Sequence, residues 1–156
     1  RRVFSMIPGL EHAEFIRYGV MHRNSFLDSP RLLHADYALR GGDQIYFAGQ
    51  ITGVEGYIES AASGILAGKN LARQLAGLQP LILPRETMMG ALAAYISDPT
   101  VENFQPMGCN MGILPDLPER IRDKKQKYQA YADRALAALD AYLEQVAAQD
   151  RGDAEE

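Results

Sequence analysis

The sequence predicts an α/β fold that ends in helices, and three observations carry this prediction. Residues 13–22, AEFIRYGVMH, combine β-branched and aromatic residues as strands do. Residues 44–49, QIYFAG, form a short apolar run behind the turn residues GGD at 41–43, which predicts a second, buried strand. Residues 118–148 carry apolar side chains at a helical period, so a long last helix with one buried face is expected.

A central helix is predicted over residues 54–76, directly after the second strand. Thr52 and Glu55 are three residues apart, as in a capping box, and the start lies anywhere from Gly53 to Tyr57. Gly77 is typical of a helix C-terminus. Small residues at helical spacing predict that this helix packs unusually close to a sheet or another helix. The small residues are Ala61, Gly64, Gly68 and Ala72.

The other segments connect these elements. Residues 24–33 are predicted as a loop held by Pro30, and residues 86–97 as a helix. The stretch 103–118 contains three prolines and two glycines, so it cannot be regular. The tail 149–156 is small, polar and acidic, which predicts disorder.

Composition places the chain among ordinary globular proteins. It has 156 residues, of which 47% are hydrophobic and 23% charged, and the net charge of −4 leaves nucleic-acid contact to a local basic patch. The first residues, RRVFSMIPGL, are typical of a chain cut in its middle. No apolar run approaches the roughly 20 residues of a membrane-spanning helix. A single cysteine, Cys109, excludes an internal disulfide and a cysteine-rich zinc site, so we expect no metal and a cytoplasmic location.

Glycines concentrate where the second strand meets the central helix. Gly49, Gly53 and Gly56 surround a helix N-terminus, whose free N–H groups suit a phosphate or an electron-rich ring edge. The alternative is a tight strand-to-helix corner without a ligand, and the residues alone favour neither. The spacing is not the GxGxxG nucleotide fingerprint.

Two polar clusters could each bind a ligand or could each be an ordinary surface feature. His22, Arg23 and Asn24 lie at the end of the first strand, where cofactors often bind in α/β folds, although a surface strand end is the more common case. The run RIRDKKQK at 120–127 has five basic residues, which favours a solvated helix face over phosphate contact. Cys109 has no histidine nearby that would activate it as a nucleophile.

Three strings together resemble the C-terminal part of the TrmFO family. They are IPGLEHAEFIRYGVMHRNSFLDSPRLL, IYFAGQITGVEGYIESAASGILAGKNLAR and NFQPMGCNMGILP, and GQITGVEGYIESAASG is highly specific. The resemblance covers about residues 2–143. The related glucose-inhibited division protein A family shares the layout but has a different string at the glycine corner.

The resemblance implies a bacterial methylenetetrahydrofolate–tRNA-(uracil-5-)-methyltransferase. Such an enzyme moves a methylene group from 5,10-methylenetetrahydrofolate to C5 of a T-loop uridine, and reduced FAD, recharged by NADH or NADPH, completes the methyl group. The implied fold is the C-terminal portion of a glutathione-reductase-like, Rossmann-type FAD-binding domain, followed by C-terminal helices. Residues 1–79 would hold the final strands and helix of that domain, and residues 80–148 a helical segment. The family's GxGxxG unit and its cysteines would belong to the missing N-terminal part of the parent protein, so the fragment would be inactive alone and holds no catalytic residue.

The resemblance also assigns candidate binding residues. The FAD contacts would be Gly49, Gln50, Thr52, Gly53, Gly56 and Tyr57. His22, Arg23 and Asn24 would contact folate or flavin, and Lys124, Lys125 and Lys127 would contact tRNA. Two other functions stay open: a tRNA wobble-uridine-modifying flavoprotein of the division protein A family, and a non-catalytic interaction module.

Overall fold

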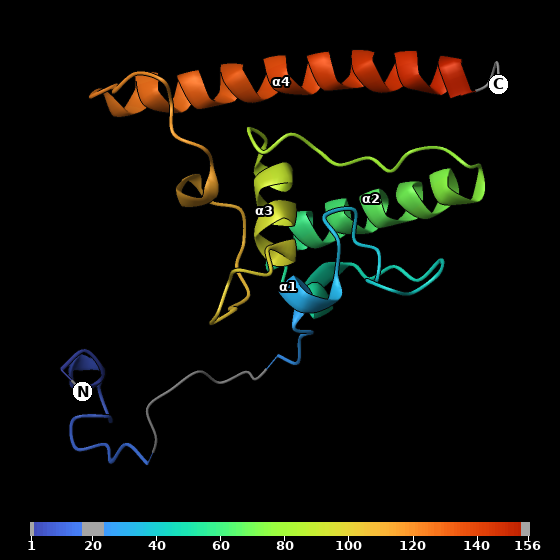
Figure 1. The fold of residues 1–156 in the computed structure, drawn as a ribbon. Helices are drawn as coiled ribbons and strands as arrows, with labels where there is room; N and C mark the ends of the chain where they lie inside the picture. The colour runs from blue at the N-terminus through green and yellow to red at the C-terminus, as the bar shows by residue number, and fades with distance from the viewer. Residues whose placement is uncertain (1, 17–23, 154–156) are drawn as a thin grey trace.

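The structure, a computed structural model, describes residues 2–16 and 24–153 (Figure 1). Within these ranges the backbone forms helices and loops, and no β-sheet is present. The elements in chain order are the 3-10 helix η1 (Phe4–Met6), α1 (Ser29–Leu32), the 3-10 helix η2 (Gly49–Thr52), α2 (Tyr57–Leu75), α3 (Met88–Ser97), the 3-10 helix η3 (Met111–Ile113) and α4 (Lys124–Asp153).

Neither predicted strand is a strand in the described residues. Most of the first, over 13–22, lies outside them, and residues 13–16 belong to no β-ladder. The second, over 44–49, contributes only an isolated bridge, between Ala38 and Tyr46. A buried strand needs a neighbour with which it exchanges hydrogen bonds along its whole length. The described chain offers residues 44–49 no such neighbour, so the sheet of the predicted α/β fold is not formed there.

The predicted turn over residues 41–43 is confirmed. Gly41 has φ 70°, and across the turn the Leu39 N–H donates to the Ile45 carbonyl at 2.8 Å. The predicted loop at 24–33 contains one short helix, α1, with Pro30 near its first position, where proline is tolerated. These segments bring Tyr37 into the core in a left-handed conformation, φ 72°, which bulky residues rarely adopt.

The central helix is confirmed as α2, but the capping box is wrong. The Thr52 hydroxyl donates to the Gly49 carbonyl at 2.7 Å, and no side chain caps the helix at its N-cap residue, Gly56. Gly53 and Gly56 both have positive φ, so the chain turns twice between Thr52 and the first helical residue. At the other end Gly77 has φ 73° and ends the helix as predicted.

Helix α3 lies at the centre of the fold and begins two residues after the predicted start. The Thr87 hydroxyl caps it by accepting the Gly90 N–H at 3.0 Å. Leu92 and Ile96 are fully buried in the main core. The other buried members of this core are Tyr37, Val54, Ala67, Ala93 and Phe104. A smaller cluster of Ala91, Leu114 and Tyr131 joins α3 to α4.

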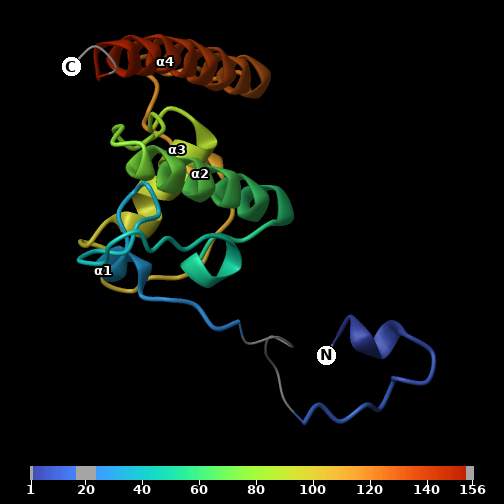
Figure 2. The ribbon, with the colours of Figure 1, turned by 90° about the vertical axis from the view of Figure 1, so that its right-hand side faces the viewer.

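The last helix begins and ends later than predicted. It starts at Lys124 rather than near Pro118, because the Asp123 carboxylate accepts the Gln126 N–H at 2.8 Å and fixes the first turn there. It continues beyond the predicted end at 148, where Asp150 pairs with Arg73 of α2 at 2.6 Å. Figure 2 shows α4 as a separate layer beside α2 and α3, while the segment around η1 lies apart from the other helices.

The outer face of α2 is apolar and exposed, contrary to the prediction that its small residues are packed. A Cβ placed on Gly64 or Gly68 would meet nothing within 4 Å. Ile58 and Ile65 on the same face are 83% and 62% exposed. We use the name outer face for the whole set: Tyr57, Ile58, Ala61, Gly64, Ile65, Gly68, Ala72 and Leu75.

Two polar residues, Ser63 and Asn70, share the buried side of α2 with Ala67. Asn70 is fully buried, and its amide donates to the carbonyls of Asp36 and Leu81 at 3.1 and 3.0 Å. Its side-chain oxygen accepts the Leu81 N–H at 2.6 Å. One asparagine thereby joins α2 to the segments before and after it.

Candidate functional site

The chain between η2 and α2 forms a corner whose shape depends on three glycines. Gly49, Gly53 and Gly56 have φ values of 73°, 84° and 99°, in the region that favours glycine. This corner is the same segment, Gly49 to Tyr57, that is predicted from the sequence to contact the flavin. The positive φ values explain why glycines stand at these three positions, and the flavin contact stays a prediction.

The corner is held from behind by buried hydroxyls. The Ser63 hydroxyl accepts the Gly49 N–H at 2.8 Å and donates to the Ser60 carbonyl at 2.8 Å. Thr52 and Ser63 are both fully buried. Thr52 thus supports the corner with its side chain, whereas the sequence places it among the cofactor contacts.

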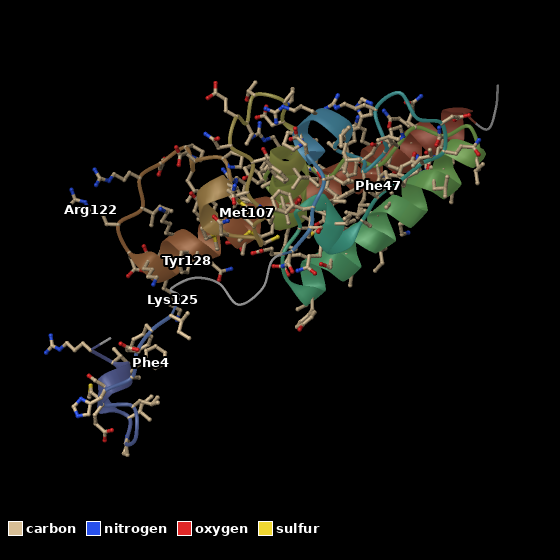
Figure 3. All side chains as sticks on the ribbon, turned by 90° about the horizontal axis from the view of Figure 1, so that it is seen from below. Phe4, Phe47, Met107, Arg122, Lys125 and Tyr128 are labelled. Carbon is tan, nitrogen blue, oxygen red and sulfur yellow. The ribbon has the colours of Figure 1, made fainter. Side chains whose placement is uncertain are left out.

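A second segment far along the chain pairs with the corner, and the sequence does not predict it. The Met107 N–H donates to the Gly53 carbonyl and the Glu55 N–H donates to the Met107 carbonyl, each at 3.0 Å. This short parallel bridge buries Val54 completely. Figure 3 shows Met107 in the middle of the molecule, between the helices and the basic end of α4. The stretch 103–118, irregular in sequence, is therefore part of the corner's support.

Gly53 and Gly56 have different surroundings. A Cβ on Gly53 would clash with the Phe104 ring, which belongs to the main core. A Cβ on Gly56 would clash only with the carboxylate end of Glu59, a flexible side chain. A substitution at Gly53 would therefore disturb the core, whereas one at Gly56 would change the surface of the corner.

A recess of about 350 Å³ opens on the solvent side of the corner. Gln50, Glu55, Gly56, Tyr57 and Ser60 line it, so three of the six predicted flavin contacts reach it and two further residues join them. A glutamate this close disfavours a phosphate, because like charges repel. Hydroxyl groups or the N–H edge of a ring suit an amide and a carboxylate better.

The second predicted cluster is largely outside the described residues. His22 and Arg23 lie there, so the structure does not place them relative to the corner. Asn24 is described and is exposed, in an irregular segment that leads to α1. Leu27, three residues further, donates its N–H to the Ile51 carbonyl at 2.8 Å. This contact brings the segment to the edge of the corner.

The predicted nucleic-acid residues lie in the first turn of α4. Lys124, Lys125 and Lys127 are exposed, and in the described residues no carboxylate pairs with them. Arg120 and Arg122 come from the chain just before the helix rather than from the helix itself. Figure 3 shows Arg122, Lys125 and Tyr128 together at this end of the molecule, with Arg122 directed outward.

Cys109 has the properties of an inert thiol. It is half-buried, and burial, followed by the charge of Glu59, raises the pKa of its thiol. Its sulfur lies 3.9 Å from that of Met89. Among the described residues no three His, Cys, Asp or Glu side chains are placed to hold a metal ion. In the same residues no helix is both long and apolar enough to cross a membrane.

The glycine corner and its helix lie in a region that matches a known family. A family model described as glucose inhibited division protein A matches residues 1–79, about half of the chain. The chain belongs to this family. A fold related to FAD-binding proteins is thereby confirmed in its coarse form, and the residues beyond α2 lie outside the match.

Curated relatives narrow the assignment and confirm the TrmFO resemblance. The chain is 60% identical over 136 residues to the methylenetetrahydrofolate–tRNA-(uracil-5-)-methyltransferase TrmFO of Enterococcus faecalis, which covers 87% of this chain and 31% of that protein. Proteins of the same name from Lactiplantibacillus plantarum and Pelotomaculum thermopropionicum are 56% and 55% identical, over 93% and 92% of this chain and 33% of their own length. The chain thus spans about a third of the length of the curated relatives it matches.

Proposed function

We propose that the protein containing this chain makes 5-methyluridine in the T-loop of tRNA, as a methylenetetrahydrofolate–tRNA-(uracil-5-)-methyltransferase. The observation that carries the proposal is the identity of 55–60% to proteins of that name over about nine tenths of this chain. The activity would belong to the whole cytoplasmic enzyme, because the relatives are about three times as long. None of the described residues is assigned to the chemical step.

The recess at the corner would hold part of FAD. Gln50 is exposed and its amide makes no hydrogen bond within the described chain, so it is available to the hydroxyls of a ribityl chain. Gly56 and Tyr57 would approach the flavin, supported from behind by Gly49, Thr52 and Gly53. When bound, FAD supplies the electrons that reduce the transferred carbon to a methyl group, and NADH or NADPH recharges it. We place residues 1–79 at the end of a glutathione-reductase-like, Rossmann-type domain and residues 80–148 in a helical segment.

The outer face of α2 would be covered by the rest of the parent protein. Its glycines and alanines allow a close approach, and its two exposed isoleucines would otherwise lie in water. A sheet contributed by the missing N-terminal part would also provide the neighbour that residues 44–49 lack. This proposal explains both departures from the predicted α/β fold by one cause.

His22, Arg23 and Asn24 would contact the folate. A planar imidazole can stack on a pterin, and the guanidinium of Arg23 suits the carboxylates of the glutamate tail. In the whole enzyme His22→Ala should raise the folate concentration needed for half-maximal activity, with flavin content and NAD(P)H oxidation near normal. An unchanged folate requirement would remove His22 from the site.

Mass analysis of tRNA from a strain that lacks the gene tests the proposed activity. We expect T-loop 5-methyluridine to disappear and to return when the gene is restored. Loss of a wobble-uridine modification instead would support the alternative flavoprotein. An unchanged set of modifications would support the non-catalytic interaction module.

Gly56→Val in the whole enzyme tests the flavin position. The new side chain would stand at the recess with a strained φ, so visible flavin absorbance per protein should fall while the protein stays folded. Gly112→Val, in η3 and away from the recess, is the control and should keep its flavin. Full flavin in Gly56→Val would mean that the corner is only structural.

A further inference from the structure

The basic end of the molecule combines cations from two elements around one hollow. Arg120, Ile121 and Arg122 approach it from the extended segment, and Lys124, Lys127 and Tyr128 from the first turns of α4. The hollow has a volume of about 510 Å³, and none of its lining residues is acidic. A neighbouring hollow of about 330 Å³ shares Arg120 and Lys127 but also contains Asp116 and Glu119. The larger hollow is therefore the one suited to an anion.

Charge is strongly segregated along the chain. Residues 119–127 carry five basic and two acidic side chains, a net charge of +3. The whole chain has a net charge of −4, so the remaining residues together carry −7. The two acids, Glu119 and Asp123, offset only part of the repulsion among the five cations, and an anionic partner would offset more of it. The described ion pairs, Arg31 with Asp28 and Arg73 with Asp150, lie elsewhere.

Tyr128 adds an aromatic surface to the same hollow. Its side chain is 43% exposed, whereas Tyr131, one turn later, is 5% exposed and belongs to the smaller core. The Lys124 ammonium lies 5.5 Å from the Tyr128 ring centroid. An exposed aromatic ring beside phosphate-binding cations is the arrangement with which proteins bind single-stranded nucleic acid, the base stacking on the ring.

We propose that this hollow binds one unpaired nucleotide of an RNA, with its base on Tyr128 and its phosphates between Arg120, Arg122 and the α4 lysines. The proposal rests on the proposed function in that it takes the RNA to be tRNA. Sequence reasoning considered the basic run for phosphate contact only. The structure adds the aromatic ring, and it brings Arg120 and Arg122 to the hollow because they precede the helix.

Binding of unmodified tRNA by the whole enzyme, measured over a range of salt concentrations, tests the proposal. Tyr128→Leu should raise the Kd for tRNA about tenfold at fixed salt, as expected for one stacked base, and leave the salt slope unchanged. Tyr128→Phe should restore the affinity. The pair Arg120→Gln and Arg122→Gln should flatten the slope of log K against log salt by about 1–2.

Two controls separate this site from general charge attraction. Arg85→Gln removes an exposed cation elsewhere and should change neither affinity nor slope. A fully paired RNA duplex should bind more weakly than tRNA and should not respond to Tyr128→Leu, because it offers no free base.

The proposal is overturned if Tyr128→Leu binds tRNA like the parent, or if tRNA and duplex lose equal affinity. If the variants at Tyr128, Arg120 and Arg122 still bind tRNA like the parent and make 5-methyluridine, the proposed function stands and this site is wrong. A parent that does not bind tRNA would overturn both. The hollow would belong to a protein partner instead if these substitutions left tRNA binding unchanged and the pair Arg120→Gln and Arg122→Gln abolished binding of another protein.

Discussion

Helices α2 and α4 differ in the kind of side chain that they bury. Helix α4 packs the Tyr131 ring into the smaller core, and it leaves Leu136 and Leu143 62% and 52% exposed. Helix α2 buries Ser63 and Asn70 and leaves Ile58 and Ile65 exposed. The proposed covering of its outer face would place α2 between two layers. One of those layers is present in the described residues.

The family match follows the same division. It ends at residue 79, just after α2, so the helix with the exposed apolar face belongs to the matched part and α4 does not. The division of the chain into an end of a larger domain and an added helical segment stays a prediction.

Removal of the Asn70 amide should break the inner side of α2. Asn70→Ala leaves the Leu81 N–H and two carbonyls without partners in a buried place, which should lower the free energy of unfolding by about 3–4 kcal/mol. Urea denaturation measures this loss. Asn103→Ala, an exposed asparagine, is the matched control and should change it by less than about 0.5 kcal/mol. Equal stability of the two variants would contradict the structural role of Asn70.

The inner side of α4 should depend on burial rather than on hydrogen bonds. Tyr131→Ala removes a ring that is 5% exposed and should cost about 2–3 kcal/mol. Tyr128 on the same helix is half-exposed, so Tyr128→Ala should lower the free energy of unfolding by less than about 0.5 kcal/mol. Thermal unfolding compares the two. A greater loss in the Tyr128 variant would mean that α4 packs by another face.

Part of this picture follows from the sequence and part does not. The helical spacing at 54–76, the stop at Gly77 and the prolines at 84 and 99 that bound the next helix are local signals, so α2 and α3 are predicted within a few residues. The bridge of Met107 to Gly53 joins segments 54 residues apart and leaves no periodic signal. The strand prediction at 44–49 is wrong for the described residues, where the segment has only the isolated bridge of Tyr46 to Ala38. An apolar run by itself does not supply the neighbour that a strand needs.

The reactivity of the Cys109 thiol depends on Glu59, which lies in the first turn of α2. Burial and Glu59 raise its pKa, so less thiolate is present at pH 8 than in an unfolded chain, and alkylation should be several-fold slower. Glu59→Gln removes one of the two causes and should accelerate the reaction. Mass spectrometry of the Cys109 peptide follows it, with a urea-unfolded sample as the reference. A folded rate equal to the unfolded rate would place the thiol in solvent.

The contact between the two helices at Asp150 should have the smallest effect. The hydrogen bonds from Arg73 hold the pKa of Asp150 below its usual range. Its contribution is therefore present above the pKa of an unfolded aspartate and is lost as pH falls through the lowered value. The protection factors of amides at the end of α4, which are exchange rates corrected for the intrinsic rate at each pH, should fall at acid pH. They should already be lower in Asp150→Asn at neutral pH, whereas Asp140→Asn should behave like the parent.

The central claim, that the outer face of α2 is buried in the whole protein, is tested most directly by the stability of Gly64→Leu in the full-length enzyme. If the face is covered, leucine overpacks it, and the free energy of unfolding should fall by about 1–3 kcal/mol. Ala137→Leu on the exposed side of α4 is the control and should cost nothing. If the face lies in solvent, leucine is the better helix former, and stability should rise by up to about 0.8 kcal/mol. A rise would contradict the account, because the predicted change has the opposite sign.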